Sequence, residues 1–207
     1  MRPDEIEKLS FEIIDTEAGD HAFSPMEWRI VRRMIHTSAD FDYMKTVRIH
    51  PQAIAAGINA IRGGKTIVTD TEMAKSGIRK KNLEQFGGRV ECLINDPRVE
   101  REAREREETR SKVAAESAIH LMEAGIYAVG NAPTALMEVV NLVRANKAKP
   151  ALIIGFPVGF VNAAESKEVL MELDYPHISN VGRKGGSNIA ASVVNALILL
   201  ALSDETL

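Results

Sequence analysis

One histidine stands out among the residues that could do chemistry, because it follows a run of arginines. Residues 31–42 read VRRMIHTSADFD, with His36 three residues after Arg33 and shortly before Asp40 and Asp42. An imidazole changes charge near neutral pH, so His36 is a candidate proton donor, and the arginines are candidate partners for ligand carboxylates. A histidine on a helix surface needs no function, however, so the rest of the chain must support that role.

The helix that carries His36 is predicted from its start signal. The sequence SPME at residues 24–27 is a capping box with proline at the first helical position. At about 100° per residue, one apolar arc holds Met26, Trp28, Ile30, Val31, Met34 and Ile35, and the opposite polar side holds Arg29, Arg32, Arg33 and His36. The arginines disfavour a second positive charge, whereas the helix C-terminus and Asp40 or Asp42 favour the imidazolium.

The elements that must position this histidine fall into two parts of one expected domain, residues 1–207. Helical patterns at residues 2–14, 24–38 and 51–62 make residues 1–63 an N-terminal helical segment. Residues 64–207 then alternate β-rich and helical runs; the β-rich runs are KTIVTD, RVECLIND, IYAVGNAP, ALIIGFPVG and HISNVGRKGG. Five such units predict an α/β fold of three layers around a five-stranded parallel sheet. The charged run RVEREAREREETRSK, after Pro97, is predicted to be one helix with a solvated face.

Glycines and prolines gather where the strands end. The segments GNAPTAL (130–136), GFPVGF (155–160) and GRKGGSN (182–188) all follow predicted strands. Open parallel sheets bind ligands at this edge, and free N–H groups at helix starts suit anions. We therefore expect the three loops to meet along one edge, which the first helices of the chain close over. The residues expected to contact a ligand there are Gly130, Asn131, Ala132, Pro157, Val158, Arg183, Gly185 and Gly186, and Lys184 is a further possible donor.

The composition excludes several classes of protein. A net charge of −3, with 45% hydrophobic and 27% charged residues, argues against a general nucleic-acid binder. The single cysteine, Cys92, suits a reducing cytoplasm, and the N-terminus shows no export signal. The apolar run at 189–202 is too short to span a bilayer and predicts a buried helix, so no membrane partner is expected. Phosphate-loop, dinucleotide, nucleophile-elbow and metal-ligand spacings are all missing, so neither a cofactor nor a bound metal is expected.

Taken together, GNAPTAL, GFPVGFVNAAESKE, GRKGGSNIAAS and RRMIHTSADFD resemble the precorrin-8X methylmutase family, nearly end to end. The resemblance implies a flavodoxin-like fold, a homodimer and an isomerase of cobalamin biosynthesis. It implies a polycarboxylate tetrapyrrole substrate, precorrin-8 or cobalt-precorrin-8, on which a methyl group moves from carbon 11 to carbon 12 to give hydrogenobyrinate or cobyrinate. No methyl donor or other cofactor is needed for this rearrangement.

The resemblance also implies roles for individual residues. His36 matches the family's catalytic histidine, a general acid, and Arg33 precedes it by three residues. Ser10, in KLSFEII, and Arg110, in TRS, match substrate-binding positions. The segment HTSADFD is closer to the cobalt-containing, anaerobic branch. Two alternatives stay open: a tetrapyrrole carrier without catalysis, and a sensor of a small phosphorylated ligand, for which no phosphate loop exists.

Overall fold

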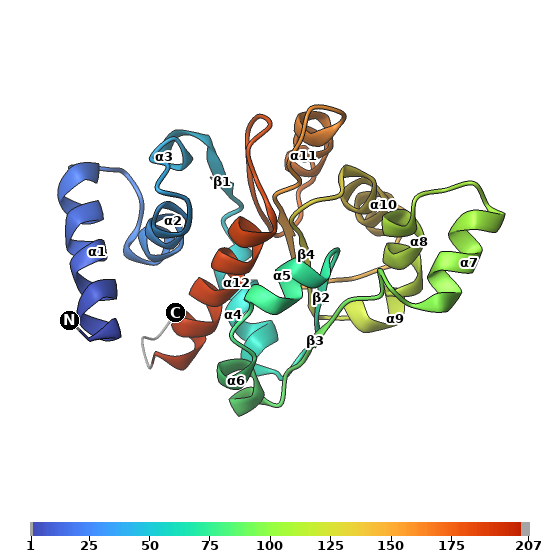
Figure 1. The fold of residues 1–207 in the computed structure, drawn as a ribbon, viewed down its shortest axis with the longest axis horizontal. Coiled ribbons are helices and arrows are strands. Elements are labelled where there is room, and N and C mark those ends of the chain that lie inside the picture. Colours follow the sequence, from blue (N-terminus) through green and yellow to red (C-terminus); the bar gives the residue numbers. More distant parts are fainter. Residues whose placement is uncertain (1, 204–207) are drawn as a thin grey trace.

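Six strands form one sheet in a computed structural model that describes residues 2–203. The strands are β1 (Val47–Ile49), β2 (Ile67–Thr69), β3 (Val90–Glu91), β4 (Ile126–Val129), β5 (Leu152–Gly155) and β6 (His177–Asn180). Helices cover both faces (Figure 1). They are α1 (Pro3–Ala18), α2 (Pro25–Ser38), α3 (Tyr43–Thr46), α4 (Ala53–Arg62), α5 (Glu72–Gly77), α6 (Lys80–Leu83), the 3-10 turn η1 (Glu84–Phe86), α7 (Pro97–Glu105), α8 (Arg110–Ser117), α9 (Ile119–Met122), α10 (Pro133–Arg144), α11 (Ala163–Met171) and α12 (Ser187–Leu202).

The sheet is mostly parallel, in the order β1-β6-β5-β4-β2-β3. The five predicted strands are all present and parallel, which confirms the α/β class, and the order β3-β2-β4-β5-β6 is one of the two common doubly wound orders. The predicted strand count was wrong, because β1 adds a sixth strand, antiparallel to β6. With three residues, β1 is too short to show the alternation that reveals a strand in a sequence.

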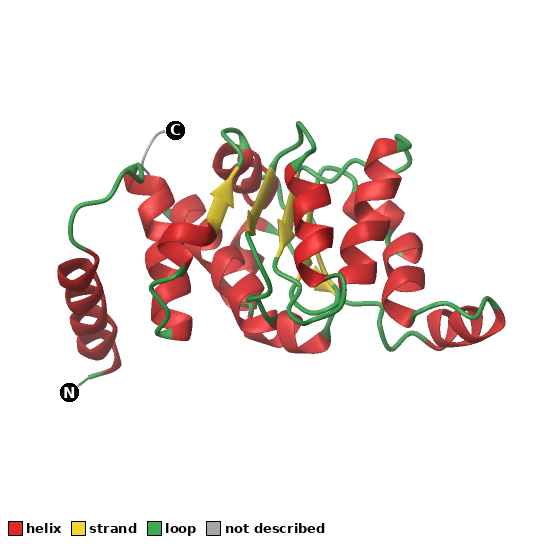
Figure 2. Cartoon of the chain, turned by 90° about the horizontal axis from the view of Figure 1, so that it is seen from above, coloured by secondary structure: helices red, strands yellow, loops and turns green. Residues whose placement is uncertain are grey.

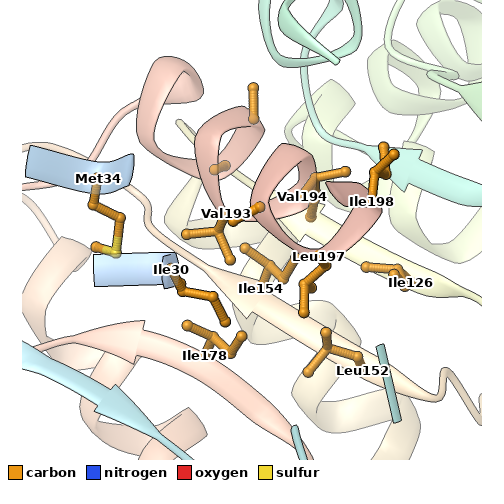
Figure 3. Packing of buried hydrophobic residues seen from close by; sticks show 14 of the residues in the cluster. Ile30, Met34, Ile126, Leu152, Ile154, Ile178, Val193, Val194, Leu197 and Ile198 are labelled. Atoms are coloured by element: carbon orange, nitrogen blue, oxygen red, sulfur yellow. The ribbon is translucent and has the colours of Figure 1, made fainter. Parts of the chain in front are cut away.

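Alternation along the central strands divides the core between the two faces. Ile126, Leu152, Ile154 and Ile178 face α12, where they pack with Ile30 and Met34 of α2 and with Val193, Val194, Leu197 and Ile198 (Figure 3). The intervening residues Tyr127, Val129 and Ile153 face α10 and its neighbours on the other side. This period of two, with both faces apolar, is the pattern of a sheet covered by helices on both sides.

Helix α12 is the buried helix that the apolar run predicted. Thirteen of its residues are buried, and α2, α4 and α5 all pack against it. Within residues 2–203, no helix is long and apolar enough to cross a membrane.

The start of α2 also follows the prediction. The Ser24 side chain accepts the Glu27 N–H, and the Glu27 carboxylate accepts the Ser24 N–H. By contrast, the charged segment after Pro97 is not one helix. It breaks between α7 and α8, where Glu107 takes a left-handed φ of 52° and Thr109 caps the new helix through the Lys112 N–H. The spacing of charged residues continues across the break, so the sequence pattern gave no sign that the helix ends there.

The N-terminal helices contribute residues to the hydrophobic core on the α12 face of the sheet. Helix α2 lies beside α12, and α1 lies outside α2 at one end of the molecule, as both views show (Figures 1 and 2). The segment after α2 reaches the carboxyl edge of the sheet, where Thr46 accepts a backbone hydrogen bond from Val181.

Candidate active site

The three glycine-rich loops do meet at the carboxyl edge of the sheet, as predicted. A side chain on Gly130 would lie 2.5 Å from Cα of Ser187, and one on Gly185 would collide with the carbonyl oxygen of Phe156. The Gly186 N–H donates to the same oxygen, at 2.9 Å. Glycine is required at positions 130 and 185 because the loops touch through their backbones.

A buried carboxylate organises the first of these loops. Asp70 follows β2 and is 2% exposed, and it accepts the backbone N–H groups of Gly130, Asn131 and Ala132, each at 2.8 Å. Burial raises the pKa of Asp70, and the three N–H donors oppose that rise. The helix start that was expected to offer its N–H groups to a ligand thus already holds an internal anion. Any contact of these three residues with a ligand uses other atoms.

The second and third loops form an exposed apolar rim with one cation. Val158, Phe160 and Val161 are exposed, whereas Pro157 is buried beneath them. The Arg183 guanidinium lies 5.5 Å from the centre of the Phe160 ring. Such a rim, with an arginine stacked on an aromatic ring, can bind a flat, partly apolar ligand that carries negative charge.

His36 lies in the last turn of α2 and is exposed. Its ring centre is 5.1 Å from that of Phe11, which comes from α1. Asp40 and Asp42, the acids expected to favour its charged form, make their hydrogen bonds elsewhere. Both carboxylates bind Nζ of Lys184 instead, at 2.6 and 2.7 Å.

This cluster of Lys184, Asp40 and Asp42 joins the end of α2 to the third loop. The Lys184 hydrogen bond lowers the pKa of Asp40, and the two carboxylates raise the pKa of Lys184. The Lys184 ammonium, which the sequence offered as a donor to substrate, is therefore already paired within the chain. The cluster brings the His36 segment beside the loop that carries Arg183.

The arginine side of α2 does not face solvent, because α1 covers it. Glu7 accepts two hydrogen bonds from Arg33, both at 3.2 Å, and a longer one from Arg79, at 3.5 Å. Asp15 binds Arg32 at 2.7 Å. Burial is the main cause of the lowered pKa of Arg33, whose side chain is 11% exposed.

The arginine cluster encloses a small cavity of about 120 Å³, lined by Phe11, Arg29, Arg32, Arg33, Ala196 and Leu199. This volume is well below the roughly 300 Å³ of a small-molecule pocket. Ser10 lies on α1 and is partly exposed, and its hydroxyl donates to the Ile6 carbonyl at 2.8 Å.

The structure does not bring all the predicted residues together. Ser10, Arg33 and His36 lie on α1 and α2, and the three loops lie beside the end of α2. Arg110 is exposed at the first turn of α8, on the far side of the molecule from α1 (Figure 1).

Sequence reasoning gave no role to Asp70, Glu7 or Arg79. For Asp70 a signal existed, since an acid directly after a buried strand sits at the ligand edge of a parallel sheet. For Glu7 and Arg79 no signal existed, because their pairing depends on how α1 docks.

The fold and these loops define a doubly wound α/β protein whose candidate ligand site lies at the carboxyl edge of its sheet. The family model for precorrin-8X methylmutase matches residues 5–200. A cobalt-precorrin-8 methylmutase of Priestia megaterium is 46% identical over 206 residues, which cover 100% of this chain and 92% of the relative. A precorrin-8X methylmutase of Pseudomonas aeruginosa is 39% identical over 194 residues, with 93% of each chain covered.

Among solved structures, a precorrin-8X methyl mutase of Thermus thermophilus is 44% identical and has a TM-score of 0.88, with 96% of each chain covered. The chain belongs to the precorrin-8X methylmutase family, which confirms the resemblance seen in its motifs. It is an intramolecular methyl transferase, an isomerase of cobalamin biosynthesis.

Proposed function

We propose that this enzyme moves a methyl group from carbon 11 to carbon 12 of precorrin-8 or cobalt-precorrin-8, with His36 as the general acid. We further propose a flavodoxin-like fold with the N-terminal helical segment covering the active-site edge. The order of the parallel strands and the Lys184 contacts with Asp40 and Asp42 support it. The observation that carries the proposal is the place of His36. Its exposed imidazole lies one turn after Arg33 and beside Phe11, and the Asp40, Asp42 and Lys184 cluster holds that end of α2 against the edge loops.

The proton chemistry follows from the rearrangement itself. Moving a methyl group on a conjugated macrocycle shifts its double bonds, so a fixed donor near the migrating carbon favours one protonation state of the ring. A placed acid of this kind contributes about 10²–10⁴-fold to the rate.

The arginine cluster supports recognition of a polycarboxylate. Glu7 already shows that a carboxylate fits between Arg33 and Arg79. Substrate acetate or propionate groups would bind the same guanidinium groups by displacing Glu7, with charge-assisted hydrogen bonds of comparable geometry. The exposed rim of Val158, Phe160 and Val161 offers apolar surface to the macrocycle.

A homodimer would explain the position of Arg110. Ser10 and Arg110 cannot easily touch one substrate in the same chain, because α1 and α8 lie on opposite sides of the molecule (Figure 1). If both bind substrate, Arg110 comes from a second copy.

We favour the cobalt-containing substrate. The relatives at 46% identity, from Priestia megaterium and Leptospira interrogans, are named cobalt-precorrin-8 methylmutases. The HTSADFD segment also favours the cobalt-containing substrate. Parallel assays with the metal-free and cobalt substrates would decide between them through the ratio of kcat/KM.

Replacement of His36 by asparagine tests the proposal directly. Asparagine can keep a hydrogen bond but cannot deliver a proton, so single-turnover absorbance kinetics should show a rate lower by about 10²-fold or more, with near-normal product binding. His120→Asn, an exposed histidine on α9, is the matched control and should react like the parent. A parental rate in the His36 variant would contradict the role of this residue. Tight binding without any spectral change in the parent would favour a carrier over an enzyme.

A further inference from the structure

Lys167 is a buried lysine that the methyl transfer itself does not call for. It lies in α11 with 0% of its surface exposed, although lysine is almost never fully buried without a partner. Its Nζ donates to Oδ1 of Asn180 at 3.2 Å and to the carbonyl oxygen of Lys184 at 2.7 Å. Both acceptors are neutral, and burial lowers the pKa of Lys167 to about 8.

The two hydrogen bonds fix the interior of the loop at residues 181–186. Asn180 is also fully buried, and its amide donates to the carbonyls of Val181 and Lys184. The Lys184 carbonyl therefore accepts from both Lys167 and Asn180. The inner side of this loop is therefore held by hydrogen bonds from the side chains of Lys167 and Asn180.

The same loop joins the end of α2 and the apolar rim to the edge of the sheet. The Lys184 side chain binds Asp40 and Asp42, after the helix of His36. The Arg183 carbonyl accepts the Gly159 N–H, and its guanidinium stacks on Phe160. A change in the path of this loop would move both the α2 end and the apolar rim.

Burial of an ammonium group without an acid partner costs stability, and a well-packed apolar residue of similar size is often neutral or stabilising instead. Lys167 therefore lowers the stability of the fold, and a buried ionisable residue of this kind indicates a function. We propose that Lys167, with Asn180, is a positioning residue that holds the 181–186 loop in the path needed to place substrate beside His36. This role rests on the proposed function, although its structural half can be measured without any turnover.

The test is Lys167→Met, which keeps the length of the stem and removes both donors. Glu168→Gln, the exposed neighbour on the same helix, is the matched control. Hydrogen–deuterium exchange should become about tenfold faster or more in peptides covering residues 181–186, with peptides of β4 and β5 unchanged. KM for the precorrin should rise more than kcat falls, with a total loss in kcat/KM of about 10²-fold, because the substrate is misplaced rather than deprived of its acid.

Three results would overturn the proposal. They are unchanged exchange in the loop, a uniform rise in exchange throughout the chain, or kinetics like those of the control. If Lys167→Met does not fold, Lys167→Gln, which is neutral and keeps one short donor, is measured in the same way. Failure of both variants to fold would make the lysine a purely structural residue. An inactive parent protein would reject the methylmutase reaction, whereas faster exchange confined to the loop would still support the loop anchor.

Discussion

The carboxylate of Asp70 offers the sharpest stability prediction, because every partner of its two oxygens is known. Oδ1 accepts from Gly130, and Oδ2 accepts from Asn131 and Ala132. In Asp70→Asn, the amide oxygen can keep two of these bonds. The new NH₂ group then faces the third N–H, so two donors meet without an acceptor.

The magnitude follows from these bonds. Loss of one hydrogen bond to a charged group costs about 1.5–3 kcal/mol, and the unsatisfied buried donor costs about 1–3 kcal/mol. Relief of the burial that raises the pKa of Asp70 offsets part of this cost. We expect a net destabilisation of about 2–4 kcal/mol, and for a chain of this size a fall in Tm of about 5–15 °C.

Urea unfolding at neutral pH measures the change in free energy, and calorimetry measures Tm. Asp20→Asn, at an exposed acid, is the control and should stay within about 0.5 kcal/mol of the parent. Exchange should also rise first in residues 130–132, since these amides lose their acceptor. A variant as stable as the control would refute the view that this carboxylate holds the loop.

The remaining predictions concern the arginine site and the buried lysine. Arg33→Ala should weaken product binding by about 1.5–3 kcal/mol and reduce its dependence on salt, and an unchanged titration would mean that the guanidinium does not meet substrate. Glu7→Gln should instead tighten binding, by up to about fivefold, because it removes the carboxylate that competes for Arg33; weaker binding would show that Glu7 helps the site rather than blocking it. The stability of the parent should rise by about 1–3 kcal/mol between pH 8 and 10.5, because over this range the unfolded Lys167 is protonated and the folded one is not. Urea unfolding of Lys167→Met across the same range should lack that rise, and an equal rise would assign it to other groups.

The sequence predicted those parts of the structure that local rules decide. The capping box at Ser24 and the five parallel strands follow from nearest-neighbour chemistry and from periodicity, and both were correct. The meeting of the loops at Gly130 and Gly185 followed from a general property of parallel sheets. Strand β1 and the break before Arg110 were missed, because each occupies too few residues to give a periodic signal.

The candidate site was harder to predict, because its pairings join residues far apart in the chain. The helical pattern predicted that the α2 arginines face solvent. In the structure α1 covers them, and its Glu7 and Asp15 bind them. Lys167 carries a charge, and a helical pattern places charges outside, so nothing local revealed its burial. Long-range pairing of this kind is decided by packing, which one sequence does not display.

The two ends of the sheet have a consequence for how copies of this protein can meet. One edge is the three-residue β1 and the other is the two-residue β3. Edges this short offer few unpaired backbone groups to a second chain, which is a common defence against unwanted sheet extension and aggregation. The homodimer proposed above would therefore form through side chains on helices and loops. Single substitutions on the surface would then tune or abolish it without disturbing the sheet.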